Sequence, residues 1–190
     1  MSSRHLTSCL VIDLEVSNGG VLELGVGVVD FRSRSLERFG SWLIRLSEPI
    51  DPDVAGLTGI TDELVRGEGR RLEDVWNTVR REYSRDLPWG AWGKDGQLVA
   101  RESSVRGIAP PFGDTYFDFG RLYGMTRAAG ERVGLDEAMV AHGLEFEGRR
   151  HRARDDAYNL GRLILEAFRF PTWPAPGAAP RTATSSTGTR

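Results

Sequence analysis

Two carboxylates stand two residues apart in the apolar run VIDLEV, near the start of the chain. Side chains alternate between the faces of a strand, so Asp13 and Glu15 point to the same face, a few ångströms apart. The pattern also fits a solvated acidic face on an edge strand. The long valine-rich run that follows, Val21 to Phe31, favours a central strand, where two acids need a ligand.

A second candidate is the segment HRARDDAYNLGRLI. It begins just before the last predicted helix and continues into that helix. Asp156 borders an apolar stripe at helical spacing, made of Ala153, Ala157, Leu160, Ile164 and Ala167. Asp155 lies about 100° around the helix, and we expect it to face solvent. An acid beside an apolar stripe is typical of a paired or metal-bound carboxylate, while the helix dipole offers a plainer explanation.

His151 precedes this helix among four arginines, Arg149, Arg150, Arg152 and Arg154. A histidine in such a segment is either a surface residue or a proton acceptor that works near neutral pH. The arginines are likewise either a solvated loop or a positive edge beside a phosphate path. Both alternatives stay open for the histidine and for the arginines.

Asp95 follows a short apolar segment that ends at Trp92, and strand ends in α/β folds are where ligands bind. An ordinary Asp-Gly turn has the same sequence. Four carboxylates and a histidine suit Mg²⁺ or Mn²⁺, whereas zinc prefers more histidine and cysteine. Two such ions clamp the attacking and leaving oxygens of a phosphodiester, and a nearby histidine accepts the proton of the attacking water. These residue types therefore suit metal-assisted phosphodiester hydrolysis.

The elements that must position these residues alternate along the chain. Cys9 to Leu14 and Val21 to Phe31 read as a hairpin around Asn18-Gly19-Gly20, and Trp42 to Leu46 as a third strand. Pro49 and Pro52 break the pattern, and a helix is predicted to begin at Thr61. The remaining predicted helices are residues 71–83, 97–105, a segment near 122, 135–141 and 153–168, and the remaining strands are 89–92 and 116–119. This order predicts an α/β domain, a mixed β-sheet flanked by helices.

Composition limits the class of protein. The chain has 190 residues, 39% hydrophobic and 27% charged, which predicts one globular domain over residues 1–170 and a flexible Pro-, Ala-, Ser- and Thr-rich tail over 171–190. No apolar run approaches the roughly 20 residues of a membrane span. The single cysteine, Cys9, predicts a reducing, cytoplasmic setting. The formal net charge of −2 argues against a basic nucleic-acid coat, although all but one of the 25 basic residues are arginine, a good phosphate ligand.

In order, the motifs resemble the DEDDh 3′–5′ exonucleases, the family of ribonuclease T and polymerase proofreading subunits. VIDLEVS is similar to the family's first motif, VLELGVGVVDF to its second strand, PDVAGLTGIT to its connecting segment and HRARDDA to its last motif. WGKD most resembles the KapD-like branch, in which the acid usually stands four residues after the tryptophan. Here Asp95 stands three residues after Trp92, and Ser17 replaces the family's usual threonine.

The resemblance implies a ribonuclease-H-like fold and two bound ions, Mg²⁺ or Mn²⁺. It implies metal-binding roles for Asp13, Glu15, Asp95 and Asp156, with Asp13 bridging both ions, and a general-base role for His151. Leu24 and Gly25 match positions that we interpret as structural. The implied activity is a 3′–5′ exonuclease that acts on the 3′ end of single-stranded RNA or DNA, RNA more than DNA, and releases nucleoside 5′-monophosphates.

Two other functions remain open from the sequence. One is a catalytically weak exonuclease-like module that binds nucleic acid or a protein partner, which the early position of Asp95 favours. The other is a phosphodiesterase that acts on small nucleotides. A narrow closed pocket would favour the small-nucleotide enzyme, and an open groove with arginines would favour a polymer substrate.

Overall fold

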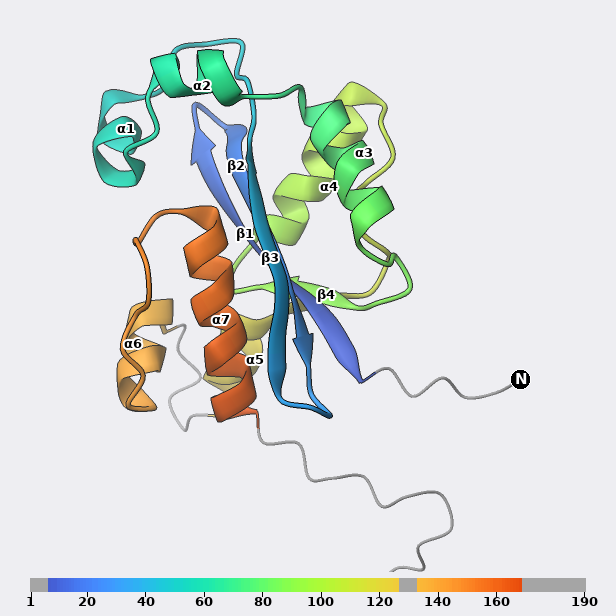
Figure 1. The fold of residues 1–190 in the computed structure, drawn as a ribbon, viewed down its shortest axis with the longest axis vertical. Coiled ribbons are helices and arrows are strands. Elements are labelled where there is room, and N and C mark those ends of the chain that lie inside the picture. The colour runs from blue at the N-terminus through green and yellow to red at the C-terminus, as the bar shows by residue number, and fades with distance from the viewer. Residues whose placement is uncertain (1–6, 127–132, 169–190) are drawn as a thin grey trace, which may run out of the picture.

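The protein is described by a computed structural model that covers residues 7–126 and 133–168 (Figure 1). Its centre is a five-stranded sheet in the order β3-β2-β1-β4-β5. The strands β1 (Ser8–Ser17), β2 (Gly20–Asp30) and β3 (Ser35–Leu43) form an antiparallel meander. The short strands β4 (Trp89–Ala91) and β5 (Tyr116–Asp118) continue the sheet in parallel with β1. The strand that carries Asp13 and Glu15 is therefore central, as predicted.

Helices cover both faces of this sheet (Figure 1). On one face lie α3 (Leu72–Glu82) and α4 (Asp95–Arg106), and on the other lies α7 (Ala153–Ala167), which contacts β1, β2 and β3. The shorter helices are α1 (Pro52–Thr58), α2 (Asp62–Glu68), α5 (Phe119–Met125) and α6 (Leu135–Ala141). The predicted fold class, a mixed sheet flanked by helices, is confirmed.

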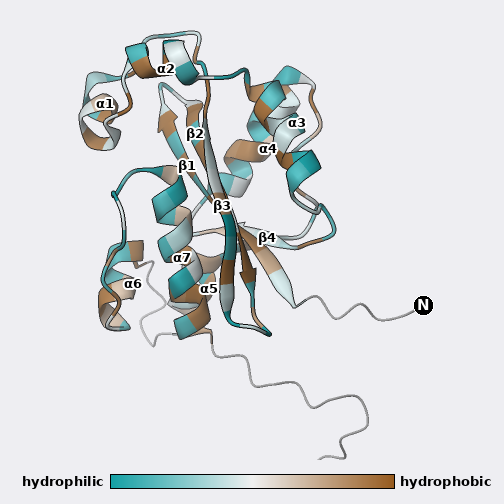
Figure 2. Cartoon of the chain, viewed as in Figure 1, coloured by the Kyte–Doolittle hydropathy of each residue, from teal (hydrophilic) through white to brown (hydrophobic). Residues whose placement is uncertain are grey.

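The core has one layer on each side of β1. Leu10 and Ile12 pack with the buried apolar face of α3, whereas Cys9 and Val11 pack with Leu160 and Ile164 of α7. In Figure 2 the helices carry both hydrophilic and hydrophobic colours, and the edge strand β3 shows hydrophilic stretches between hydrophobic ones. Because side chains alternate along a strand, Asp13 and Glu15 continue the face of Cys9 and Val11, toward α7.

Two predicted elements differ from the structure. The third strand lies at Ser35–Leu43 and not at Trp42 to Leu46, because it pairs with β2 along an edge and most of its residues are only partly buried. The segment around Pro52 is a helix, α1, because proline stands in its first turn and the Asp51 carboxylate accepts the backbone N–H of Asp53. The remaining helices and strands agree with prediction to within a few residues, and Thr61 caps α2 as expected.

Among the helices of residues 7–126 and 133–168, none combines the length and apolar character that crossing a membrane requires. The tail predicted for residues 171–190 lies outside the described part of the chain.

Candidate active site

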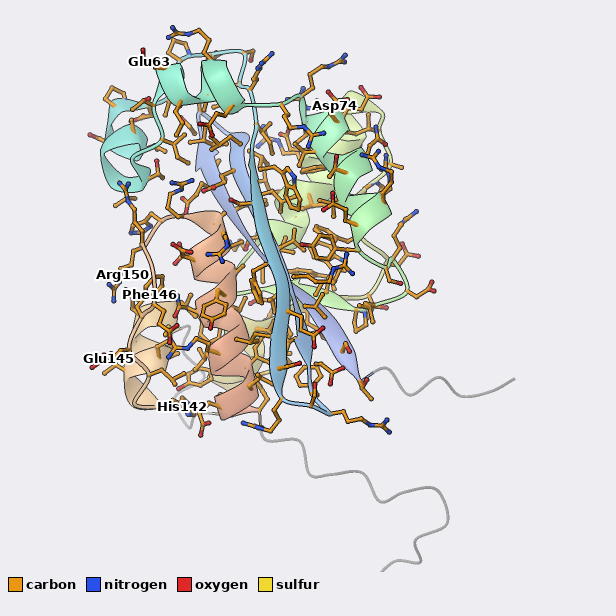
Figure 3. All side chains as sticks on the ribbon, in the orientation of Figure 1. Glu63, Asp74, His142, Glu145, Phe146 and Arg150 are labelled. Carbon is orange, nitrogen blue, oxygen red and sulfur yellow. The ribbon has the colours of Figure 1, made fainter. Side chains whose placement is uncertain are left out.

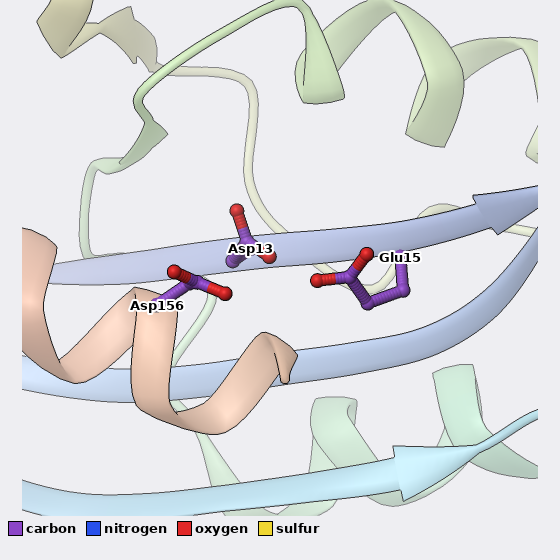
Figure 4. Close-up of side chains that lie close together, drawn as sticks. All are labelled: Asp13, Glu15 and Asp156. Carbon is purple, nitrogen blue, oxygen red and sulfur yellow. The ribbon is translucent and has the colours of Figure 1, made fainter. Parts of the chain in front are cut away.

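Three of the predicted carboxylates meet at the contact between β1 and the start of α7. Asp13 and Glu15 approach from the strand, and Asp156 approaches from the first turn of the helix (Figure 4). Each offers a carboxylate oxygen, and these oxygens all lie within 4.8 Å of one another. All three side chains are half-buried, so the cluster is open to solvent on one side.

The cluster holds protons more tightly than ordinary carboxylates. Burial raises the pKa of Glu15 to about 7, and the negative charges of Asp156, Glu23 and Asp95 add to this. Burial raises the pKa of Asp156 to about 6, against the lowering effect of the His151 charge and backbone. Burial, and then Asp95, Asp156 and Glu15, hold the pKa of Asp13 well above its usual range. An all-oxygen set that is costly to ionise in the free protein fits a hard divalent cation, which would neutralise it.

We expect the metal-free protein to lose stability as the pH rises from about 5 to 8. The Glu15 carboxyl has an ordinary pKa of 4.5 and a folded-state pKa of about 7. The stability that the bound proton contributes is therefore fully present below the unfolded-state value and is lost as the pH rises through the folded-state value. Melting curves in chelator should fall less steeply with pH for Glu15→Gln than for the native protein. Equal pH dependence would mean that Glu15 is already ionised in the folded state.

Asp95 is the first residue of α4, the helix that follows β4, and β4 is the parallel neighbour of β1 in the sheet. It is not one of the three residues whose oxygens lie within 4.8 Å of one another. Its charge nevertheless acts on the cluster, because it is the largest contribution after burial to the raised pKa of Asp13. Asp118, the other acid near this sheet edge, accepts the backbone N–H of Arg121 as the N-cap of α5.

The loop that carries His151 is fastened to α7 by side chains of the helix itself. Asn159 accepts the N–H of Glu147 (3.0 Å), Asp155 accepts that of Arg149 (2.8 Å) and Asp156 accepts that of Arg152 (3.1 Å). The side chain of His151 is exposed, and its backbone adopts a left-handed conformation with φ of 58°. The expectation that Asp155 faces solvent is wrong, because its carboxylate is mostly buried under this loop.

Glu23 is a buried acid that the sequence analysis did not single out. It stands opposite Glu15 on β2, and its side chain is 1% exposed. Its Oε1 atom accepts a hydrogen bond from Nη2 of Arg152 at 2.9 Å. Its Oε2 atom accepts one from Nε of Arg152 and one from the backbone N–H of Ala153, each at 3.0 Å. This bidentate pair joins the residue after His151 to the centre of the sheet.

Gly25 sets how closely α7 approaches the sheet. A Cβ atom at this position would lie 2.0 Å from the backbone oxygen of Ala153 and 2.6 Å from the backbone nitrogen of Arg154. Only glycine therefore lets the first turn of α7 rest directly on β2. The structural interpretation of Gly25 agrees with this contact.

Loss of the Glu23 charge should destabilise the fold strongly. Glu23→Gln removes the charge that binds the Arg152 guanidinium through two hydrogen bonds, from a side chain that is 1% exposed, so we expect the free energy of unfolding to fall by about 3 kcal/mol. Glu73→Gln is the matched control, because it breaks an exposed pair with Arg71 and should cost less than about 1 kcal/mol. Urea denaturation measures both. Similar losses for the two variants would contradict an anchoring role for Glu23.

Two aromatic residues whose ring types could stack on nucleotide bases, Phe112 and Trp92, are packed into the protein. Phe112 is 1% exposed and stacks on Trp89, with ring centroids 4.6 Å apart. The indole N–H of Trp92 donates to the carbonyl of Val133 at 2.9 Å. Both rings therefore have packing or hydrogen-bonding contacts within the fold.

The five-stranded mixed sheet with helices on both faces has the ribonuclease-H-like fold, which the chain shares with solved exonuclease structures. The chain is similar to the nuclease domain of 3′hExo, a DEDDh family member bound to rAMP, with a TM-score of 0.73 and 17% identity over 85% of this chain and 92% of that one. It is also similar to exonuclease X in complex with 5′ overhanging duplex DNA (TM-score 0.63, 19% identity, 88% and 95% coverage).

A third similar structure is E. coli exonuclease I with a dT13 oligonucleotide, with a TM-score of 0.67 and 13% identity. The match covers 84% of this chain and 40% of exonuclease I. Comparison with protein-family models gives no match, and comparison with curated proteins gives none either. At these identities the likeness concerns the fold.

Proposed function

We propose that the protein is a metal-dependent 3′–5′ exonuclease that removes nucleoside 5′-monophosphates from the 3′ end of single-stranded nucleic acid, RNA in preference to DNA. The observation that carries the proposal is the convergence of Asp13, Glu15 and Asp156 within 4.8 Å at the contact between β1 and α7. Similar folds belong to nucleases that bind rAMP, a histone mRNA stem-loop and DNA. The preference for RNA and the KapD-like branch rest on the sequence motifs.

The proposed roles follow from the placement of each residue. Asp13, Glu15 and Asp156 would hold divalent cations, Mg²⁺ or Mn²⁺, with Asp95 contributing from the start of α4. When bound, such ions polarise the phosphodiester and favour ionisation of a water molecule. The exposed His151 imidazole would accept the proton of the attacking water. Asp155, Asp156 and Glu23 would hold the histidine loop in place.

The test is incubation with 5′-labelled single-stranded RNA and DNA, each with and without Mn²⁺. The proposal expects a metal-dependent ladder of shortened products that keep the 5′ label, and a faster ladder on RNA. Asp74→Asn is a suitable control, because this exposed acid lies in the first turn of α3 and is not part of the carboxylate cluster (Figure 3). Products that lose the label from the 5′ end, or no products with either substrate, would contradict the proposal.

A second candidate function is a weakly catalytic module that binds nucleic acid or a protein partner. The observation in its favour is that Asp95 stands outside the group of three close carboxylates. This candidate expects binding of the labelled strands without a ladder. The cytoplasmic location predicted from the sequence is part of either proposal.

A further inference from the structure

Most arginines near the candidate site are occupied by acidic partners. Arg150 pairs with Asp136 at 2.8 Å and lies over the ring of Phe146, on the outer side of the loop before α7 (Figure 3). Arg152 pairs with Glu23 and Arg154 with Asp155. Each of these three arginines therefore forms an ion pair with an acidic residue of the same chain.

Arg149 is different. Its guanidinium lies against Gly59, the left-handed residue that ends α1, with nitrogen atoms 2.1 Å and 2.5 Å from where a Cβ atom would stand. Within residues 7–126 and 133–168 it has no carboxylate within 4.0 Å. The glycine makes room for a guanidinium that pairs with no carboxylate of the described residues.

Arg101 on α4 repeats this arrangement. Its two terminal nitrogens lie 3.7 Å and 3.8 Å from the Cβ position of Gly19, in the turn between β1 and β2. The side chain belongs to an exposed residue, and the described part of the chain places no carboxylate within ion-pair distance of it. A second guanidinium thus stands over a glycine turn with no acidic partner in the part of the chain that the structure describes.

The two arginines lie on two different elements next to the carboxylates. Helix α4 begins at Asp95, which acts electrostatically on Asp13, and Arg101 follows six residues later, about 9 Å along the helix axis. Arg149 precedes His151 by two residues and reaches toward α1. In the view of Figure 1, α1 and α4 lie to either side of the end of β1. The guanidinium of Arg101 thus stands beside the turn between β1 and β2, and Gly19 in that turn follows Glu15 by four residues.

We infer that Arg101 and Arg149 bind backbone phosphates of the nucleotides that precede the reacting one, so that the site takes a polymer and not a mononucleotide. This inference rests on the proposed function. Guanidinium groups match phosphate oxygens with two parallel hydrogen bonds, and they offset the repulsion between the strand and the acidic cluster. Phosphate contacts position a strand without reading its bases, so this binding is independent of sequence.

The first arm of the test measures equilibrium binding of a fluorescent single-stranded oligonucleotide in chelator, where no hydrolysis occurs, over a range of NaCl concentrations. The double variant Arg101→Gln/Arg149→Gln should bind at least about tenfold more weakly, and the slope of log K against log salt should fall by about 1.4, since each phosphate contact on a single strand contributes about 0.7. RNA and DNA oligonucleotides should be affected equally.

The matched control is Arg32→Gln/Arg81→Gln, which removes the same charge. Arg32 lies in the turn after β2, at the opposite end of the β1–β2 pair from Gly19, and Arg81 lies on α3. This variant should keep the salt slope of the native protein. Equal loss of affinity and slope in the two double variants would overturn the inference, because the effect would then follow net charge and not position.

The second arm follows a small chromogenic substrate, thymidine 5′-(p-nitrophenyl phosphate), with Mn²⁺. The Arg101→Gln/Arg149→Gln variant should hydrolyse it at the native rate while trimming oligonucleotides more slowly. Equal losses on both substrates would overturn the inference, because the arginines would then serve the reacting phosphate. Hydrolysis of neither substrate by the native protein would contradict the proposed function, and the binding arm would still decide the role of the arginines.

Discussion

Asp13→Asn is expected to abolish hydrolysis and to raise the melting temperature of the metal-free protein. Two like charges about 4 Å apart repel by about 4 kcal/mol at an effective dielectric constant of 20. Protonation and solvent relieve most of this, which leaves about 1–2 kcal/mol for the substitution to recover, or roughly 2–8 °C in a domain of this size. The residue is central to the cluster, because Asp95, Asp156 and Glu15 all raise its pKa.

Four melting curves measure this result: the native protein and the variant, each in chelator and in Mn²⁺. Mn²⁺ should stabilise the native protein by mass action, by about 2.7 kcal/mol at a hundredfold excess over its dissociation constant, and should stabilise the variant much less. The exposed Asp74→Asn should respond to metal as the native protein does. If Mn²⁺ shifts neither protein and Asp13→Asn is simply less stable, the acids are structural and the metal-site proposal fails.

His151→Ala should reduce the rate of trimming by roughly 10²–10⁴, the usual contribution of a general base. The fold should survive, because the imidazole is exposed and the loop is held by Asp155, Asp156 and Asn159. The matched control is His142→Ala. His142 lies at the end of α6, far from the start of α7, and contacts the ring of Tyr123 edge-on (Figure 3).

The left-handed backbone of His151 requires a second variant. Alanine is strained at φ of 58°, whereas asparagine tolerates this region but does not accept a proton in the same way. His151→Asn should therefore be as inactive as His151→Ala, and added imidazole should restore part of the rate in both. Near-native activity of His151→Asn would show that the position serves the loop conformation and not proton transfer.

The sequence predicted the parts of the fold that depend on local signals. The hairpin followed from alternating apolar runs around Asn18-Gly19-Gly20, and α7 followed from its buried stripe. The edge strand β3 was misplaced because its residues are only partly buried, so hydropathy favoured the more apolar segment just after it. Helix α1 was missed because Pro52 was interpreted as a break, although a preceding Asp51 cap is typical of a helix start.

The sequence likewise predicted some residues of the candidate site and missed others. The spacing of Asp13 and Glu15 predicted that they share a face, and the resemblance to the exonuclease motifs implied that Asp156 joins them; the structure brings oxygens of all three within 4.8 Å of one another. Glu23 was not identified, because its partner Arg152 stands 129 residues away and no local pattern connects them. Only the packing of α7 against β2 brings the two together. The one sequence signal available was an acid inside the apolar run VLELGVGVV.

The contact at Gly25 has a consequence for how this site tolerates change. The distance from Asp156 to the acids of β1 is fixed where one main chain rests on another, with no side chain between them. Substitutions elsewhere in the core can alter volume and packing without altering that distance, because none of those side chains lies in the gap. Chains that have diverged until few residues agree can therefore keep the same carboxylate geometry, provided that this one position stays without a side chain.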